Sequence, residues 1–429
     1  MSVVGCQLLV TDNRQPITDN DLIENIVNLA GDYKRTLKAL FATAIRFNLP
    51  VAVWRLPNSP EVKLCVSLRS FQTLGSVPQV EGGLPGFAFY PFAVSNKNPA
   101  AFIKADITFS SLSAKLKFNF KLNGDPEYVA LVQRLQEYFE KVKDSAVANH
   151  WHISKHALPL ATSRDNFQNL VQSGVLAIEA HLFEKVVLSR ARAEAISPDF
   201  DVIDAFCLLQ ETYSHAFISL VSVPDVGTWM GASPEVLVSV DRNKTFRTVA
   251  LAGTQALTPE ANPATVLWRQ KEIEEQALVE RYIISYLKKI RLREFTEIGP
   301  RTVAAGNLMH LRTDFVVNMN EVPYPNLGTE MLSLLHPTSA VCGMPKEPAT
   351  AFIRQYEGYD RAYYSGFLGP VQIDGESHIY VNLRCMQLFE QAALLYAGAG
   401  ITAESEPEKE WLETDMKMDT MYRIIRKEA

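Results

Sequence analysis

Strand-like segments joined by short turns are the feature that most limits how this chain can fold. Residues 228–240 (TWMGASPEVLVSV) and 245–253 (TFRTVALAG) are separated only by the turn sequence DRNK. Residues 378–389 and 392–400 form a second pair of this kind, joined through Glu390 and Gln391. We expect both pairs to be antiparallel, because a parallel pair needs a crossover of about a dozen residues or more.

Helical spacing of apolar residues occurs in separate blocks. It predicts helices at residues 20–47, 127–143, 167–184, 271–292, 349–356 and 408–427, whereas residues 101–120 and 185–196 have strand patterns. A regular alternation of strand and helix is missing, so we predict an α+β fold and not a doubly wound parallel sheet. The polar segment at residues 142–166 is the candidate boundary between an N-terminal and a C-terminal part.

Charge and hydropathy exclude several classes of protein. The 42 basic and 48 acidic side chains are interspersed and give a net charge of −6, so we expect no nucleic-acid partner. No apolar run reaches roughly 18 residues, which argues against a membrane-spanning helix. The first residues do not have the pattern of a secretory signal, so we expect a cytoplasmic protein. The five scattered cysteines predict reduced thiols.

Two motifs match catalytic or cofactor patterns only in part. GASPE at residues 231–235 resembles a nucleophile elbow, but a proline follows Ser233 and a strand comes next instead of a helix. GAGITA at residues 398–403 has the spacing of a dinucleotide-binding loop, but its helix begins only near Pro407. We therefore expect neither a serine nucleophile nor a bound dinucleotide.

Two predicted helices each carry a pair of glutamates on one face. Glu272 and Glu275 are three residues apart, and so are Glu410 and Glu413. Either pair alone is typical of a solvated helix surface. Together they offer oxygen ligands of the kind that Mg²⁺ prefers, and a bound cation would relieve the repulsion within each pair.

A lysine and a glutamate at strand ends are candidates for acid–base chemistry. Lys185 opens the strand KVVLSR, and it is either an edge residue in water or a buried amine that acts as a base. Glu235 lies between Pro234 and an apolar strand, where burial would keep its carboxyl protonated and make it an acid.

Small residues with polar neighbours occur at further strand ends, in LAGT (residues 251–254), YYSGFLG (363–369) and YAGAG (396–400). Strand alternation places Arg384 on one face with Tyr380, Asn382 and Met386, from which its guanidinium could bind a carboxylate. Combined with the acid pairs, the base and the acid, these features predict a site for a small, carboxylate-rich metabolite with Mg²⁺.

The motifs together resemble the chorismate-utilising enzymes, a family that includes isochorismate, salicylate, anthranilate and aminodeoxychorismate synthases. The resemblance spans residues 180–420, in the family's order and spacing. The matching segments are KVVLSR, GASPEVL, ALAGT, KEIEEQALV, NLMHL, LHPTSAVCG, YYSGFLGPV, VNLRCM and YAGAGITAESEPEKEWLET. Two residues depart from the family pattern: Gln276 replaces a histidine that often follows the metal-binding glutamate, and Ser339 replaces a common proline.

The resemblance implies two stacked antiparallel sheets surrounded by helices, in one domain over residues 1–429, with a variable part (1–150) and a motif-bearing catalytic part (151–429). It implies that Lys185 activates water and that Glu235 is the general acid. It implies that Glu275 and Glu413 bind Mg²⁺, with Glu272 and Glu410 as neighbouring carboxylates. The implied substrate-binding residues are Gly253, Thr254, His310, Tyr364, Arg384, Gly398, Gly400 and Lys417.

The activity implied is that of an isochorismate synthase, closest to the menaquinone type. Such an isomerase converts chorismate reversibly to isochorismate with Mg²⁺, for menaquinone or siderophore biosynthesis. Salicylate synthase, which also expels pyruvate, is the alternative, and a non-catalytic chorismate-binding module is a further one. We expect chorismate as the only partner and a monomer.

Overall fold

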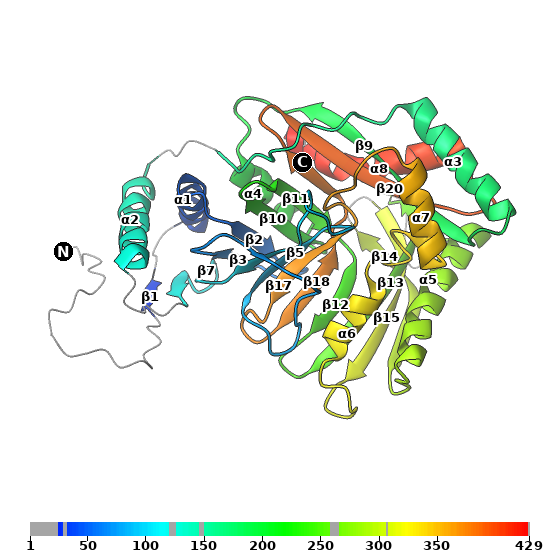
Figure 1. Cartoon of the computed structure of the whole chain (residues 1–429), viewed down its shortest axis with the longest axis horizontal. Helices are drawn as coiled ribbons and strands as arrows, with labels where there is room; N and C mark the ends of the chain where they lie inside the picture. The colour runs from blue at the N-terminus through cyan, green and yellow to red at the C-terminus, as the bar shows by residue number, and fades with distance from the viewer. Residues whose placement is uncertain are drawn as a thin grey trace.

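The computed structural model describes residues 25–28, 32–119, 126–145, 150–257, 266–305 and 308–427. Within these residues the chain forms two antiparallel sheets that pack against each other, with helices on their outer sides (Figure 1). The predicted α+β fold with two stacked antiparallel sheets is confirmed.

The two sheets differ in size and in the order of their strands. In the first sheet the order is β1 (Asn25–Asn28), β8 (Lys115–Phe118), β7 (Ile107–Ser110), β3 (Val62–Val66), β2 (Val51–Arg55), β10 (Phe217–Val223), β11 (Gly227–Ser233), β19 (Cys385–Leu388), β20 (Ala392–Ile401), β9 (Lys185–Ala195) and β16 (Gly343–Met344). In the second sheet the order is β14 (Thr296–Ala305), β15 (Leu308–Asn318), β13 (Thr245–Ala256), β12 (Val236–Val240), β18 (Ser377–Val381), β17 (Phe367–Val371), β5 (Gly86–Tyr90), β6 (Ala101–Lys104) and β4 (Gln72–Thr73).

Helices cover the outer faces of both sheets (Figure 1). Helices α1, α4 and α8 pack on the first sheet, and α5 and α6 pack on the second. Helices α3 and α7 pack beside β9. The bounds are α1 (Tyr33–Arg46), α2 (Pro126–Val142), α3 (Arg164–Glu179), α4 (Val202–Thr212), α5 (Gln270–Lys289), α6 (Leu327–Leu335), α7 (Lys346–Tyr356) and α8 (Pro407–Arg426).

An aromatic core fills the space between the two sheets. Trp229 of β11 is 2% exposed, and its ring contacts those of Phe89 in β5 and Tyr396 in β20. Phe217 of the first sheet stacks on Tyr380 of the second with 4.1 Å between the ring centres. Because these rings come from both sheets, their burial holds the two layers together.

Residues from the N-terminal part of the chain complete both sheets. Strand β2 pairs with β10, and β5 pairs with β17. The helix predicted at residues 20–47 is wrong at its start, because β1 pairs with β8 and α1 begins only at Tyr33. Asp32 has extended backbone, and its side chain accepts a hydrogen bond from Lys34 N (3.0 Å), so it caps the helix. Residues 20–24 and 29–31 lie outside the described residues.

Two segments predicted as single strands each divide between the two sheets. Residues 228–240 form β11 in the first sheet and β12 in the second, and residues 378–389 form β18 in the second and β19 in the first. Pro234 has no N–H to continue a ladder, which favours the exit of the chain from the first sheet after Ser233. We call these two places the strand crossings, at residues 234–235 and 382–384.

The second strand crossing overturns one prediction about Arg384. Its backbone is left-handed, with a φ of 47°, and it lies between β18 and β19 instead of within a strand. Tyr380 and Met386 belong to different sheets. Arg384 therefore does not share a strand face with them and with Asn382, because the alternation that predicts such a face holds only inside one continuous strand.

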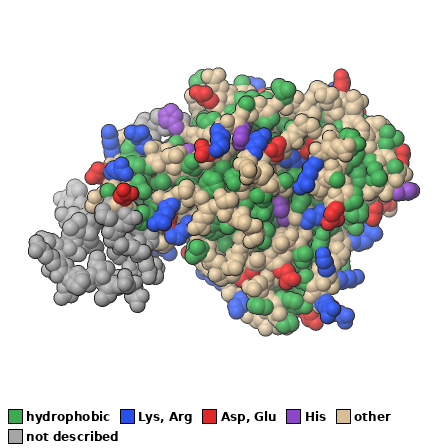
Figure 2. All heavy atoms as spheres, viewed as in Figure 1, with side chains coloured by type: hydrophobic (Ala, Val, Ile, Leu, Met, Phe, Trp, Pro, Cys, Tyr) green, Lys and Arg blue, Asp and Glu red, His purple; other side chains and the backbone are tan. Residues whose placement is uncertain are grey.

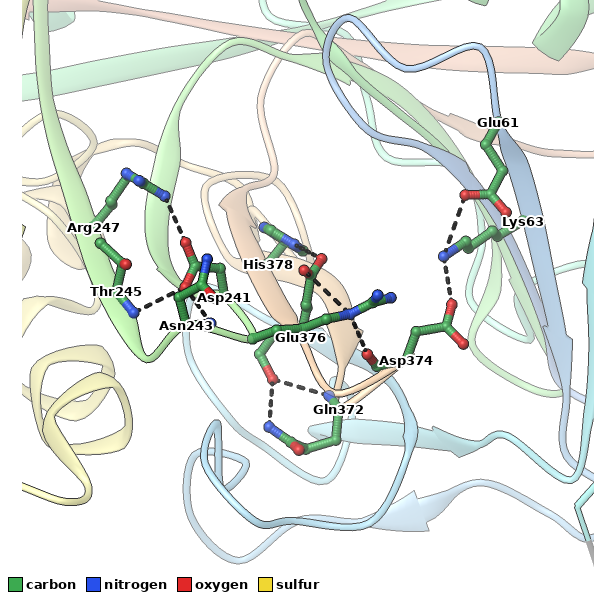
Figure 3. A network of polar contacts seen from close by, with 12 residues as sticks. Glu61, Lys63, Asp241, Asn243, Thr245, Arg247, Gln372, Asp374, Glu376 and His378 are labelled. Carbon is green, nitrogen blue, oxygen red and sulfur yellow. Dashed lines mark hydrogen bonds and ion pairs between the residues drawn. The ribbon is translucent and has the colours of Figure 1, made fainter. Parts of the chain in front are cut away.

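A polar network joins the sheets at their turns (Figure 3). Lys63 of β3 forms an ion pair with Asp374 (2.6 Å), which lies in the turn between β17 and β18. Arg242, in the turn between β12 and β13, donates to the backbone carbonyl of Asp374 (2.8 Å). Asp241 accepts from Thr245 N (2.9 Å), and the predicted hairpin through residues 241–244 is confirmed. One strand of the first sheet is thus tied to two hairpins of the second.

Charges of both signs share the surface. Over the described residues on the face that Figure 2 shows, Lys and Arg side chains are interspersed with Asp and Glu, without one large patch of a single sign. Among the described helices, none has both the length and the apolar content that a membrane span requires.

Truncation of Trp229 should weaken the packing between the sheets. We expect Trp229→Ala to destabilise the protein by about 3–5 kcal/mol, because it leaves a cavity in a fully buried layer. The midpoint of urea unfolding, followed by circular dichroism, measures the loss. Leu160→Ala is the control, since Leu160 is 92% exposed. Equal midpoints for the two variants would contradict the packing described here.

Candidate active site

A pocket lies beside the two strand crossings. The empty space in and in front of it is about 650 Å³, which includes open solvent at its mouth. The predicted site residues that line it are Glu235, Gly253, Thr254, Glu275, His310, Tyr364, Arg384, Gly398, Gly400 and Lys417. The remaining lining residues are Val187, Pro234, Leu251, Ala252, Ala340, Val341, Leu383, Tyr396 and Ala397. Strands of both sheets and helices α5 and α8 therefore supply its walls.

Glu235 is a buried carboxyl at the first strand crossing, 4% exposed. Its backbone carbonyl accepts from Val381 N (3.1 Å), which ties it to β18. Its Oε1 accepts a hydrogen bond from the hydroxyl of Thr338 (3.4 Å). Burial raises the pKa of Glu235 to about 7, although the Thr338 hydrogen bond and the charges of Lys185 and Lys417 oppose the rise. Burial therefore favours the protonated form of Glu235 up to near neutral pH.

Lys185 opens β9 and is buried, with only 1% of its side chain exposed, so it is not an edge residue in water. Its Nζ lies 2.8 Å from Glu275 Oε1. Burial by itself would raise the pKa of Glu275, but the adjacent charge of Lys185 lowers it overall. A Cβ atom at Gly400 would overlap Glu275 and come within 3.0 Å of Lys185 Cε. Glycine at position 400 thus leaves room for the lysine–glutamate pair.

His310 and Arg384 form a hydrogen-bonded chain with the backbone. His310 Nδ1 lies 2.7 Å from the carbonyl oxygen of Gly253, so Nδ1 must donate. Its Nε2 lies 3.1 Å from Arg384 Nη2, which can only donate, so Nε2 must accept. Burial, together with the charge of Arg384, lowers the pKa of His310 to about 3. The imidazole is therefore neutral, in one tautomer, and holds Arg384 in place.

The backbone that presents Gly253 departs from regular strand geometry. Gly253 has a φ of 67°, and the pairing of β13 with β15 shifts register between Ala252 and Gln255. This bulge turns the carbonyl of Gly253 towards His310, and glycine adopts the left-handed backbone at least cost. Thr254 follows it on the pocket wall.

Lys417 adds a second cation to the pocket. Its Nζ donates to the carbonyl of Gly398 (2.9 Å) and to Glu413 Oε1 (2.6 Å). Tyr364 stacks on Tyr396 with 5.3 Å between ring centres, and a Cβ atom at Gly398 would come 2.9 Å from the hydroxyl of Tyr364. Arg384 and Lys417 together can bind an anionic substrate from two directions.

Helices α5 and α8 bring their acid pairs together. Lys271 Nζ lies 2.5 Å from Glu410 Oε1 and joins the two helices. The charges of Glu410, Glu413 and Glu275 all raise the pKa of Lys271, although burial opposes them. Burial and the neighbouring charge of Glu413 raise the pKa of Glu410. Glu410 Oε2 is buried and has no hydrogen-bond partner within the described residues.

These carboxylates fit a Mg²⁺ site of low protein coordination. In the part of the chain that the structure describes, no three acidic, histidine or cysteine side chains converge as metal ligands. Mg²⁺ requires only one or two carboxylates, because water and substrate oxygens complete its shell. Glu275 and Glu413 each pair with a lysine in this structure, whereas one oxygen of Glu410 has no partner among the described residues and could accept a cation. Glu272 is already engaged, since its carboxylate accepts from Arg269 N (2.8 Å) at the start of α5.

Two residues have contacts that no sequence motif predicts. Thr338, in the segment LHPTSAVCG, hydrogen-bonds Glu235. Gln276 points away from the acid pairs: its amide donates to Glu280 (3.0 Å) and to the carbonyl of Ala250 in β13 (3.3 Å). Glutamine in place of the family's common histidine at position 276 therefore affects how α5 packs on the second sheet.

Comparison with known proteins agrees with this fold. Residues 86–426 match the family described as chorismate binding enzyme. Isochorismate synthase EntC of Escherichia coli K12 is 30% identical over 282 residues, which cover 64% of this chain and 69% of EntC. Isochorismate synthase DhbC of Bacillus subtilis is 29% identical over 313 residues, which cover 70% and 76% of the two chains.

The solved structure of MenF, described as the menaquinone-specific isochorismate synthase of Escherichia coli, superimposes with a TM-score of 0.74. It covers 94% of both chains at 21% identity, so it shows that the two proteins share a fold. Since the family match extends over most of the sequence and includes every residue of the pocket, this chain belongs to the chorismate binding enzyme family.

Proposed function

We propose that this enzyme is an isochorismate synthase, which adds water at C2 of chorismate and releases the hydroxyl from C4. The observation that carries the proposal is a buried lysine, Lys185, which pairs with the pocket residue Glu275 and lies near enough to the buried carboxyl of Glu235 for its charge to lower that pKa. The relatives EntC and DhbC, which are named isochorismate synthases, support the same activity.

Lys185 and Glu235 divide the proton transfers between them. Lys185 takes a proton from the water that attacks C2, which requires that the ammonium paired with Glu275 first release its own proton. Its contact with Glu275 must then be exchanged for one with that water. Glu235 donates its proton to the hydroxyl that leaves C4, so that the hydroxyl departs as water. Because one water is consumed and one is released, the reaction is nearly balanced and runs in both directions.

Cations and backbone groups orient the substrate. Arg384, held by His310, and Lys417, held by Gly398, are placed to bind the two carboxylates of chorismate. Thr254 and Tyr364 lie on the same pocket walls and offer hydroxyls. Glu275 and Glu413 would hold Mg²⁺, and a bound Mg²⁺ would supply Lewis-acid stabilisation of negative charge on the substrate.

We also propose that residues 1–429 work as one domain. The support is that β2 pairs with β10 and β5 with β17, so strands from the first 150 residues belong to both sheets that carry the pocket.

Product analysis with chorismate and Mg²⁺ tests the proposed function directly. We expect isochorismate, formed reversibly, and a kcat about 10²–10⁴-fold lower for Lys185→Gln, the usual effect of removing a positioned base. Lys155→Gln, at a lysine whose side chain is 61% exposed, is the matched control. Salicylate with pyruvate would identify the alternative enzyme, and unchanged chorismate would indicate a binding module.

The pH dependence of kcat/KM reports the ionisation of Glu235 in the free enzyme. We expect activity to fall as pH rises through about 7, because the acid loses its proton there. Thr338→Val removes the hydrogen bond that stabilises the carboxylate, so the alkaline fall should move to higher pH. Thr350→Val is the control, because it removes a hydroxyl hydrogen bond of the same kind, to the carbonyl of Lys346 within helix α7. An alkaline limb that stays in place or moves to lower pH would argue against Glu235 as the acid.

Calorimetric titration with MgCl₂ measures metal binding without relying on turnover. We expect the protein to bind Mg²⁺ and Glu413→Gln to lose that binding, since it replaces a carboxylate with a neutral amide. Glu408→Gln, on the same helix and outside the pocket, should bind as the wild type does. EDTA should abolish turnover. Undiminished binding by the Glu413 variant would show that the ion sits elsewhere.

A further inference from the structure

The strand that carries Lys185 has one edge that no neighbouring strand completes. On one side β9 pairs with β20 along its length. On the other side β16 reaches only as far as Lys185 and Val186. The next amide, Val187 N, donates to the carbonyl of Cys342 (3.0 Å). Buried N–H and C=O groups need partners. Further along this edge, Ala191 bonds to Thr162, whereas the carbonyl of Val187 and the N–H of Ser189 bond to side chains.

Glu357 and Arg361 take the place of the missing strand. Glu357 Oε1 accepts from the backbone N of Ser189 (2.6 Å) and from its hydroxyl (2.7 Å). Arg361 Nη2 donates to the carbonyl of Val187 (2.8 Å). The two side chains also bind each other, with 2.6 Å between Arg361 Nε and Glu357 Oε2, and are only 2% and 1% exposed. Water cannot readily replace either partner at such depth.

The same guanidinium also bonds to a second residue that lines the pocket. Arg361 Nη1 donates to the carbonyl of Val341 (2.7 Å), which lines the pocket. Three residues earlier in that segment, Thr338 hydrogen-bonds Glu235. The backbone carbonyl of Arg361 accepts from the N–H of Tyr364 (2.9 Å). One side chain therefore joins the strand of Lys185 to the segment that contacts Glu235.

We propose that Glu357 and Arg361 form a positioning pair, which sets the separation between the amine of Lys185 and the carboxyl of Glu235. The proposal rests on the proposed function, in which these two groups act on one substrate. Neither Glu357 nor Arg361 is among the lining residues, so the pair acts through β9 and through Val341. A planar guanidinium can donate to Glu357, Val187 and Val341 at once, whereas an ammonium lacks this rigid fork.

Arg361→Lys tests the positioning role against a matched control, Arg55→Lys. Arg55 is 4% exposed and lies outside the pocket lining. Its guanidinium also donates to backbone carbonyls, those of Leu56, Tyr213, Ser214 and Ala216. We expect both variants to lower the melting temperature. Only Arg361→Lys should lower kcat with chorismate, by about 10–100-fold with KM changed less than about threefold, because a small displacement of reacting groups costs rate more than affinity.

Hydrogen exchange gives a readout that does not require turnover. Peptides that contain residues 187–189 should exchange faster in Arg361→Lys than in the wild type or in Arg55→Lys. If Arg361→Lys does not fold, Ser189→Ala replaces it, since that change removes only the hydroxyl contacts with Glu357 and Tyr359. Ser189→Ala should also lower kcat while it changes KM little.

The outcomes separate this inference from the proposed function. If the wild type converts chorismate and the Arg361 variant loses no more kcat than the Arg55 variant, the positioning role is wrong. If the wild type does not convert chorismate, the proposed function fails. In that case hydrogen exchange alone tests whether Arg361 positions β9. If residues 187–189 exchange at the same rate in Arg361→Lys as in the wild type, the positioning role is wrong.

Discussion

The burial of ionisable groups between two sheets is the constraint on which this structure depends. At residues 234–235 and 382–384 the chain passes from one sheet to the other, and Glu235 and Arg384 lie at these crossings. A charge buried without a partner is costly, so each group must be neutral or paired. Glu235 meets this requirement through a raised pKa, and Lys185 meets it through Glu275. The architecture thus buries a carboxyl with a raised pKa and a paired amine near one pocket.

Residues behind the pocket hold these groups in place through hydrogen bonds. His310 is kept neutral and orients Arg384, while the bulge at Gly253 supplies the carbonyl that selects its tautomer. Behind β9, the pair formed by Glu357 and Arg361 completes the strand edge that begins with Lys185. Arg384 and Lys417, the two cations of the pocket, are therefore each held by hydrogen bonds to neighbouring residues. Such support is what a site needs if its groups are to keep a fixed geometry.

Local features of the chain were predicted where a local rule applies. The turn at residues 241–244 and the hairpin through Glu390 and Gln391 were found as predicted, because both depend on neighbouring residues alone. The spacing of Glu272, Glu275, Glu410 and Glu413 placed each pair on one helical face, since helix period is a local property. The start of α1 was wrong, because pairing of β1 with β8 joins residues far apart in the chain.

The sequence by itself determined the fold class, the antiparallel hairpins, the family and the residue types available for acid–base chemistry. Only the tertiary structure decided that residues 228–240 and 378–389 each divide between two sheets, that Thr338 hydrogen-bonds Glu235, and that Arg361 joins β9 to Val341. These features arise from contacts between residues distant in sequence. Such contacts depend on how whole layers pack, and periodicity and turn chemistry carry no information about that packing.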